Sequence, residues 1–393
     1  MVQLQERLAP LRARGSFDEL SFRLGVLLGQ PVVIDATLRL FSAGILPPPA
    51  RKRFLYAGLE ADDLARTLRA IRSLADWPRA WTVEARRQEV RARAAEVSSL
   101  PTVRARATRH WLAAALAYGF ASAAIGPSSA PATELDEARL AAFACAAPGL
   151  EPPATPVTVP WPTAPLPGWL RLPAQASGPV PLVALFNGAG IVKEEMTLWS
   201  TPFLERGLAT LAFDGPGCGE LRGRLAVDIG QEDITGTILD WAAAHPALDA
   251  GRVALLGVSF GGALAIHHTA RNPAVRACVA VTPPFHPPPY ADRVHPFVMA
   301  EIAALCGQPE STARARACEL SCLPFVNDVR CPTLVIGASL DAIVPPTEAR
   351  RLYNALPGPK TLLYLKRATH IGLSHVDIWT TVAADWLAAR LGE

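Results

Sequence analysis

Hydrophobic positions follow two different spacings along the chain. In about the first 125 residues, apolar side chains recur at three- and four-residue intervals with Arg and Glu between them, which is typical of amphipathic helices. This spacing predicts helices over Ala61–Ala75, Trp81–Val97 and Val103–Ser122, and a shorter one over Leu135–Ala146. We therefore expect a helical domain, which we place at residues 1–150.

The pattern changes after Pro148–Pro167, a segment with too many prolines for a helix to run through it. Beyond it, short runs rich in Val, Leu and Ala alternate with helical segments. The runs that we predict to be strands are Val180–Phe186, Ala209–Phe213, Val253–Leu256, Ala277–Val281, Thr333–Ile336 and Thr361–Leu365. The helices predicted between and after them are Glu194–Arg206, Ile229–Ala244, Phe260–Arg271, Thr347–Leu356 and Val376–Leu391. Buried strands joined by crossover helices form a mostly parallel sheet.

Two further features complete the predicted α/β domain, which we place at residues 151–393. Segments near Pro156–Trp161 and Trp169–Leu172 fit antiparallel edge strands, which brings the sheet to eight strands. The alternation of strand and helix is interrupted at about residues 283–330, where a proline-rich stretch precedes a helical pattern over Pro296–Cys306. An insertion of this length between two strands is typical of a cap over a binding site.

Composition excludes several classes of protein. Half of the residues are hydrophobic and 19% are charged, which is too apolar for a disordered chain. The net charge is +3 and no block of Lys or Arg stands out, so we expect no nucleic-acid partner. Apolar runs fall short of the roughly 18 residues that a membrane span needs, and the first residues lack the apolar core of a secretory signal.

The cysteines point to a reducing compartment. There are seven of them, an odd number, spread widely and without a CxxC pair. Free thiols in a cytoplasmic protein are therefore the expected state. No histidine pair follows at ligand spacing, so we expect neither a metal nor a cofactor, and the expected partner is a small-molecule substrate.

The clearest chemical signal is Gly257-Val-Ser259-Phe-Gly261-Gly262, which lies between a predicted strand and a predicted helix. A serine at such an elbow adopts a strained backbone conformation in which side chains two residues away on either side would collide, and the glycines remove them. A tight turn without a chemical role is the alternative interpretation. The strand–elbow–helix context favours Ser259 as a nucleophile and predicts an α/β-hydrolase fold.

A serine hydroxyl needs a base to take its proton, and in this fold the acid and the histidine follow the serine in that order. His370 follows the last predicted strand by a loop long enough to return to the strand ends, and is the predicted base. His375 begins the final helix and is the weaker alternative. Asp341 follows the preceding strand and is predicted to orient His370, with a surface turn as its alternative role.

An oxyanion intermediate also needs two backbone N–H donors. One is predicted to be Phe260, directly after the nucleophile. The second is expected from the loop Asn187-Gly188-Ala189-Gly190 after a strand, at Ala189 or, as the alternative, at Gly188. Glycines there allow the close backbone approach that the oxyanion requires.

Three motifs together resemble the FrsA-like α/β-hydrolases, a family that includes 2,6-dihydroxypseudooxynicotine hydrolase and fungal polyketide-shortening hydrolases. They are Lys193-Glu-Glu195, the run Phe213-Asp-Gly-Pro-Gly-Cys-Gly-Glu220 and the nucleophile elbow. The second motif is the most specific, and the resemblance covers most of the chain. It implies an N-terminal helical lid over the active site, a homodimer, and the triad Ser259, Asp341 and His370.

The resemblance also implies hydrolysis of an ester, or of a carbon–carbon bond beside a ketone, in an aromatic or polyketide-like substrate. Carbon–carbon hydrolases of this kind place a glutamate in the insertion after the sixth strand. Here that neighbourhood contains Asp292 and His295, with no Glu before Glu301. This departure leaves the reaction open, and whether Asp292 or His295 takes the place of that glutamate is a question for the structure.

Both charged motifs also have structural interpretations. Pro216 and the glycines around it set a tight turn that Asp214 can cap, and this structural role is the favoured one for Asp214. Glu194 and Glu195 can simply favour the first turn of a helix, where negative charge is stabilised.

Aromatic residues predict an apolar pocket between the helical domain, the sheet and the insertion. For each of them alone, core packing is the alternative interpretation. The residues expected to line it are Trp77, Trp81, Trp111, Tyr118, Phe120, Phe285, His286 and Tyr290. Such a pocket suits a bulky hydrophobic substrate.

Three classes of function fit these observations. The first is a hydrolase that acts through a covalent adduct on Ser259, and the second is an acyltransferase or cyclase that uses the same triad while excluding water. The third is a binding protein on the same fold, because fold does not fix function. The presence of Ser, Asp and His in the required order argues against the third class.

Overall fold

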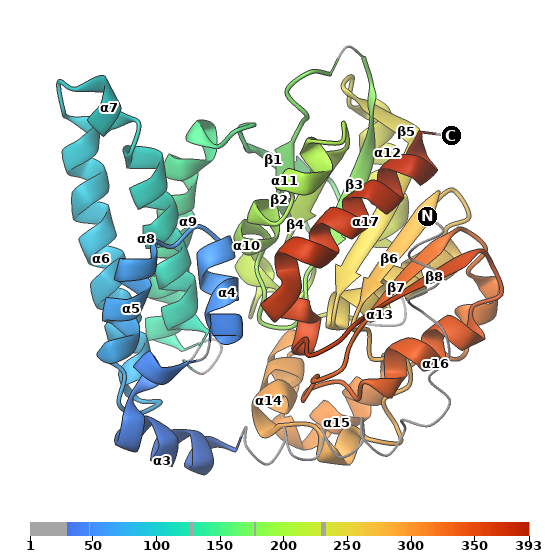
Figure 1. The fold of residues 1–393 in the computed structure, drawn as a ribbon. Helices are drawn as coiled ribbons and strands as arrows, with labels where there is room; N and C mark the ends of the chain where they lie inside the picture. Colours follow the sequence, from blue (N-terminus) through green and yellow to red (C-terminus); the bar gives the residue numbers. More distant parts are fainter. Residues whose placement is uncertain are drawn as a thin grey trace.

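The computed structural model describes residues 30–46, 48–123, 125, 129–176, 178–228 and 233–392 of the chain (Figure 1). Residues 1–29 of the expected helical domain, and 229–232 of a predicted helix, lie outside the described residues. The remainder forms a layer of helices, blue to teal in Figure 1, that lies against a larger α/β unit, green to red in the same figure. None of the helices described is long and apolar enough to cross a membrane.

The first layer consists of helices that share one apolar core. They are α3 (Pro31–Phe41), α4 (Pro48–Tyr56), α5 (Ala61–Arg69), α6 (Asp76–Glu96), α7 (Pro101–Arg104), α8 (Ala107–Ser122) and α9 (Ala130–Ala146). Helix α9 begins five residues before the predicted Leu135. Pro131 lies in its first turn, where the missing N–H of proline costs nothing, and Ser129 caps it by accepting a hydrogen bond from the N–H of Ala132.

The α/β unit contains the predicted eight-stranded sheet, in the order β1-β2-β4-β3-β5-β6-β7-β8. Its strands are β1 (Thr155–Val159), β2 (Leu166–Arg171), β3 (Val180–Phe186), β4 (Ala209–Phe213), β5 (Leu248–Val258), β6 (Ala277–Val281), β7 (Thr333–Ala338) and β8 (Lys360–Leu365). The pairs β1–β2 and β2–β4 are antiparallel and the others parallel. The prediction of a mostly parallel sheet with an antiparallel edge is therefore confirmed.

Helices cover both faces of the sheet. They are α10 (Lys193–Leu198), α11 (Thr201–Leu204), α12 (Ile234–Ala244), α13 (Phe260–Arg271), α16 (Thr347–Ala355) and α17 (Val376–Leu391). In β3, Leu182, Ala184 and Phe186 belong to the core with α12, α13 and α16, while Val183 and Leu185 belong to the core with α10, α11 and α17. This period of two is the side-chain alternation of a strand that is buried on both faces.

Two elements differ from their predicted form or stand outside the sheet. The predicted helix Glu194–Arg206 is interrupted after α10, and α11 starts anew with Pro202 in its first turn, because proline cannot continue a helix from within. The insertion between β6 and β7 carries α14 (Pro296–Leu305) and α15 (Glu310–Glu319), which lie together at one end of the sheet (Figure 1).

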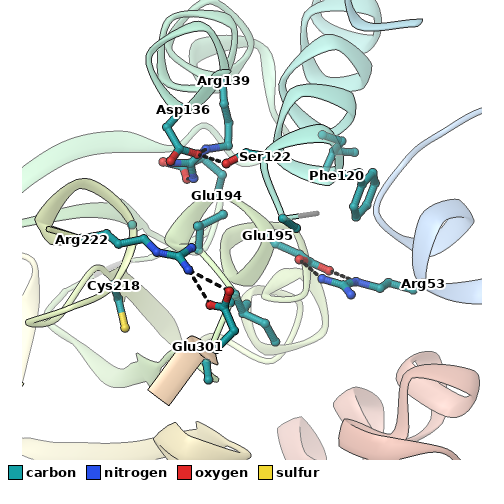
Figure 2. Close-up of a pocket in the computed structure, with 18 of the residues that line it drawn as sticks. Arg53, Phe120, Ser122, Asp136, Arg139, Glu194, Glu195, Cys218, Arg222 and Glu301 are labelled. Carbon is teal, nitrogen blue, oxygen red and sulfur yellow. Dashed lines mark hydrogen bonds and ion pairs between the residues drawn. The ribbon is translucent and has the colours of Figure 1, made fainter. Parts of the chain in front are cut away.

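Two consecutive glutamates join the helical layer to the α/β unit. Glu194 at the start of α10 accepts hydrogen bonds from Arg139 of α9 and from the indole of Trp169, at 2.5 and 3.1 Å. Glu195 accepts both hydrogen bonds of the Arg53 guanidinium at 2.8 Å, as Figure 2 shows. The motif that could have served only to start a helix therefore also holds two helices of the other layer in place.

We predict that Arg139→Ala lowers the free energy of unfolding by about 3–5 kcal/mol, because it leaves the buried carboxylate of Glu194 without a partner from α9. Arg139 and Glu194 are 1% and 2% exposed. The measurement is urea unfolding followed by circular dichroism. Arg314→Ala is the matched control, since its partner Asp292 is 80% exposed, and it should change stability by no more than about 1 kcal/mol. Equal losses in the two variants would contradict a structural role for the buried pair.

Candidate active site

Ser259 lies at the sharp turn between β5 and α13. Its backbone has φ 53° and ψ −119°, a conformation that a residue with a side chain rarely adopts. A Cβ atom at Gly257 would collide with the carbonyl of Gly261, and one at Gly261 would collide with the carbonyls of the β3–α10 turn. Both glycines are therefore required for the turn, as the sequence pattern predicted.

The structure brings Ser259, His370 and Asp341 together at the carboxyl ends of the strands. The Ser259 Oγ lies 2.8 Å from His370 Nε2, and His370 Nδ1 lies 2.7 Å from Asp341 Oδ2. The other oxygen of Asp341 accepts the N–H groups of Ile343 and Val344 at 2.9 Å each. Asp341 is 1% exposed, so its carboxylate faces the imidazole and not solvent. With Nδ1–H donated to Asp341, His370 Nε2 is left to accept the serine proton.

A threonine with no role predicted from the sequence supports the histidine loop. Thr282, directly after β6, accepts the N–H of Ile371 through Oγ1 at 3.1 Å and lies 3.5 Å from His370 Nδ1. Ser259, Thr282 and Ile371 all have positive φ, and among the described residues only two other non-glycine residues do. Three of these strained backbone conformations therefore lie next to the predicted catalytic side chains. The periodicity of the sequence does not reveal them.

The alternative candidates named from the sequence lie outside this arrangement. His375 pairs with Ser374 at the start of α17. Burial in the core beneath α13 lowers the pKa of His267 to about 4 and that of His268 to about 3, so both are neutral packing residues. Asp292 is exposed and pairs with Arg314.

The loop expected to supply the second oxyanion donor passes beside the serine. Ala189 and Ser259 both line the same hollows, whereas Gly188 packs against the carbonyl of Val258. Among the described residues, none accepts a hydrogen bond from the N–H of Phe260 or of Ala189. This placement favours Ala189 over Gly188, and the oxyanion role of both N–H groups stays a prediction.

Asp214 holds the loop that starts at Asn187 in place through hydrogen bonds. Its buried carboxylate accepts hydrogen bonds from the Asn187 amide at 2.9 Å, from the backbone and ammonium of Lys193 at 3.0 Å each, and from the Glu220 N–H at 3.2 Å. A side chain at Gly219 would collide with the same carboxylate. Asp214 thus does more than cap its own turn, because it ties the loop that starts at Asn187 to α10.

Three carboxylates of this region converge in the way that a cation site requires. One oxygen each from Glu194, Asp214 and Glu220 lies within 4.8 Å of the others. The Lys193 ammonium lies among them, at 2.7, 3.0 and 2.5 Å. Burial alone would lower the pKa of Lys193, but these carboxylates raise it above its ordinary value, so the ammonium remains charged.

A cavity of about 510 Å³ opens between the helical layer, the Ala189 loop and α14, with Ser259 and His370 in its wall. This volume lies in the range of sites for small organic molecules. Most of the lining is apolar. The charged side chains in the wall include three arginine–glutamate pairs, which Figure 2 shows: Arg53–Glu195, Arg139–Glu194 and Arg222–Glu301.

Only part of the predicted aromatic lining faces a hollow. Trp77 and Phe120 line the large cavity, and Tyr290 lines a second, smaller hollow beside Ser259. The residues that line neither are Trp81, Trp111, Tyr118, Phe285 and His286. Trp81, for example, is fully buried and stacks on Phe54 inside the helical layer. Helical spacing identifies an inward face, but it does not distinguish a domain's own core from a surface shared with a second domain.

The acid that the insertion contributes to the cavity is Glu301, and neither Asp292 nor His295 lines it. Glu301 is 5% exposed on its side chain, and Arg222 donates to both of its oxygens at 2.8 and 2.7 Å. Glu301 has no role predicted from the sequence. The available signal was a single acid in the otherwise apolar helix α14, PFVMAEIAAL, since a charge in such a helix needs a buried partner or a cavity.

The sequence matches the profile described as FrsA-like, "Esterase FrsA-like", over residues 57–353, which is most of the chain. This chain belongs to the FrsA-like esterase family. The 2,6-dihydropseudooxynicotine hydrolase of Paenarthrobacter nicotinovorans is 33% identical over 135 residues, which are 34% of this chain and 36% of that protein. The α/β hydrolase ucsC of an Acremonium species is 39% identical over 137 residues, or 31% of this chain and 27% of that protein. The matches therefore span about a third of the length of these curated relatives.

Solved structures extend the likeness of the fold to almost the whole chain. A 2,6-dihydroxy-pseudo-oxynicotine hydrolase superposes with a TM-score of 0.77 at 24% identity, covering 86% of this chain and 95% of that one. AbyA5 superposes with a TM-score of 0.67 at 20% identity, covering 86% of this chain and 97% of that one. The fold of most of this chain is therefore found in other solved structures.

We predict that Asp214→Asn slows covalent labelling of Ser259 by a fluorophosphonate about 100-fold. The loss of charge facing Lys193 releases the loop that starts at Asn187, and a displacement of about 1 Å at a reacting centre can cost this much. The measurement is the second-order labelling rate by intact-protein mass spectrometry. Asp233→Asn removes the charge of an exposed carboxylate at the cap of α12, where an amide oxygen can accept the same hydrogen bond, and should leave the labelling rate unchanged. Equal rates in Asp214→Asn and the parent protein would show that Asp214 stabilises the fold without positioning the loop.

Proposed function

We propose that this protein is a serine hydrolase in which Ser259 is the nucleophile and His370 the general base, while Asp341 orients the imidazole and stabilises the imidazolium that forms. The observation that carries the proposal is the continuous relay Asp341–His370–Ser259, at 2.7 and 2.8 Å, in the wall of a large apolar cavity. Membership of an esterase family supports it, as do relatives that are named hydrolases.

The geometry supports a two-step reaction. Ser259 Oγ attacks the substrate's carbonyl carbon while His370 Nε2 takes its proton, and the oxyanion accepts hydrogen bonds from the N–H groups of Phe260 and Ala189. Collapse of this intermediate breaks the bond to the leaving group, which takes the proton from His370. Water then attacks the acyl group on Ser259, gives one proton to His370, and releases a carboxylic acid and the free serine.

The same relay serves an ester and a ketone. In an ester the departing atom is oxygen, and in a ketone with a carbon–carbon bond to be cleaved it is a carbon that leaves with the proton from His370. The large, mostly apolar cavity favours a bulky hydrophobic substrate. Its paired charges, such as Arg222 and Glu301, still offer hydrogen-bonding atoms. Aromatic or polyketide-like molecules with hydroxyl or keto groups are therefore the proposed substrate class.

We predict that a fluorophosphonate labels Ser259 in the parent protein and that Ser259→Ala abolishes both the labelling and the hydrolysis of aryl esters. Loss of the serine of a triad costs roughly 10⁶ in turnover. The measurements are peptide mapping of the labelled protein and release of the aryl alcohol. Labelling elsewhere, or none in either protein, would favour a binding protein on this fold.

We predict that Asp341→Asn lowers kcat for an aryl ester about 10⁴-fold with an intact fold, because the imidazole then loses its orienting charge. His370→Ala should be at least as damaging. His375→Ala is the matched control, since His375 pairs with Ser374 and not with Ser259, and it should retain parent activity. A His375→Ala protein as inactive as His370→Ala would contradict the assignment of the base.

Hydrolysis and acyl transfer differ only in the nucleophile that ends the reaction. In an assay of an aryl ester with and without an added alcohol, the proposal predicts the free acid as the main product in both cases. A new ester as the main product would assign the protein to the acyltransferases or cyclases, with the same triad.

A further inference from the structure

Two hollows of very different size meet at Ser259. The large cavity of about 510 Å³ lies under the helical layer, and a second hollow of about 40 Å³ lies under the insertion. Both are lined by Ser259 and by Ala189, the proposed oxyanion residue. A carbonyl carbon held at the serine therefore has one substituent directed to each hollow.

Helix α14 separates the two hollows. Glu301 and Leu305 line the large cavity, while Met299 and Ile302 line the small hollow, and Val298 lines both. Because neighbouring positions of a helix face different directions, one helix can form a wall of each space. Substitutions on α14 can therefore change one hollow without changing the lining of the other.

The placement of His370 indicates which hollow receives the leaving group and which receives the acyl substituent. The general acid must lie beside the leaving group in order to protonate it. His370 lines the large cavity and does not line the small hollow. The small hollow is lined instead by Phe260, whose N–H is proposed as an oxyanion donor together with that of Ala189. This placement assigns a leaving group to the large cavity and an acyl substituent to the small hollow.

The size and polarity of the small hollow limit that substituent. The small hollow has less than a tenth of the volume of the large cavity, about 40 Å³ against about 510 Å³, so it admits only a short substituent. Among the described residues, its lining contains no charged side chain, and most of its wall is Val, Ile, Leu, Met, Ala and Pro. We propose, building on the hydrolase function above, that the substrate is a short aliphatic acyl derivative, of about two to four carbons, of a bulky leaving group.

The test is a series of 4-methylumbelliferyl esters of acetate, butyrate, hexanoate and octanoate, which share one bulky leaving group. We expect kcat/KM to peak at acetate or butyrate and to fall at least about tenfold by octanoate, since each methylene that does not fit costs discrimination. In parallel, fluorophosphonate labelling of Ser259 reports whether the nucleophile is active.

Two substitutions on α14 test the two hollows one at a time. Ile302→Ala enlarges the small hollow and should shift the preferred chain by two or more carbons. Leu305→Ala, three residues further along the same helix, lines only the large cavity and should keep the parent preference. Ala317→Val, which narrows the small hollow from α15, should favour acetate over butyrate and tests the same idea if Ile302→Ala does not fold.

Each outcome of these experiments supports or overturns the proposed preference for short acyl chains. A peak at short chains that moves with Ile302 and not with Leu305 supports the inference. A rate that is flat or rises through octanoate overturns it and leaves the hydrolase function standing. So does labelling of Ser259 without hydrolysis of any of these esters. If neither hydrolysis nor labelling occurs, the hydrolase function and the inference fail together.

Discussion

The buried ion pair of Lys193 and Asp214 connects the parts of this molecule that have to work together. Asp214 holds the Ala189 loop through Asn187, and Lys193 holds Asp214, Glu194 and Glu220 around its ammonium. The next two residues, Glu194 and Glu195, continue the network into the helical layer through Arg139 and Arg53. A buried charge is tolerated only when it is paired and hydrogen-bonded. The positions of the helical layer and of the Ala189 loop are therefore set by one network, and a shift of either would leave a buried charge unpaired.

The sheet and the close arrangement of Ser259, Asp341 and His370 could be predicted from the sequence, because both follow from local rules. Buried strands appear as short apolar runs, and the order of Ser259, Asp341 and His370 follows from the ends of successive strands. The prediction for α9 begins too late, at Leu135, because the first turn of a helix accepts a proline such as Pro131. Proline interrupts a helix only from an interior position, and here the capping residue Ser129 shows that Pro131 lies in the first turn.

The lining of the cavity could not be predicted in the same way, because it depends on how two separate apolar surfaces meet. Trp81 and Trp77 lie four residues apart on α6, yet one is fully buried in the helical core and the other reaches the cavity. Arg139 and Glu194 are distant in sequence, and no spacing marks them as partners. Glu301 could have been singled out by its apolar neighbours, but its partner Arg222 comes from a loop after β4 that carries no periodic signal.

The distribution of charge around Ser259 has a chemical consequence. The charged side chains, all of them held in pairs, lie on the side of His370, while the small hollow beside Phe260 has an uncharged wall. A leaving group that carries hydroxyl or keto groups can exchange hydrogen bonds with Arg222, Glu301 or Glu195 as it departs with its proton. An aliphatic acyl chain gains nothing from such groups and is favoured where polar atoms are absent. Polarity and size thus orient the substrate in the same direction, with its polar, bulky part beside the general acid, so that the bond facing His370 is the one that breaks.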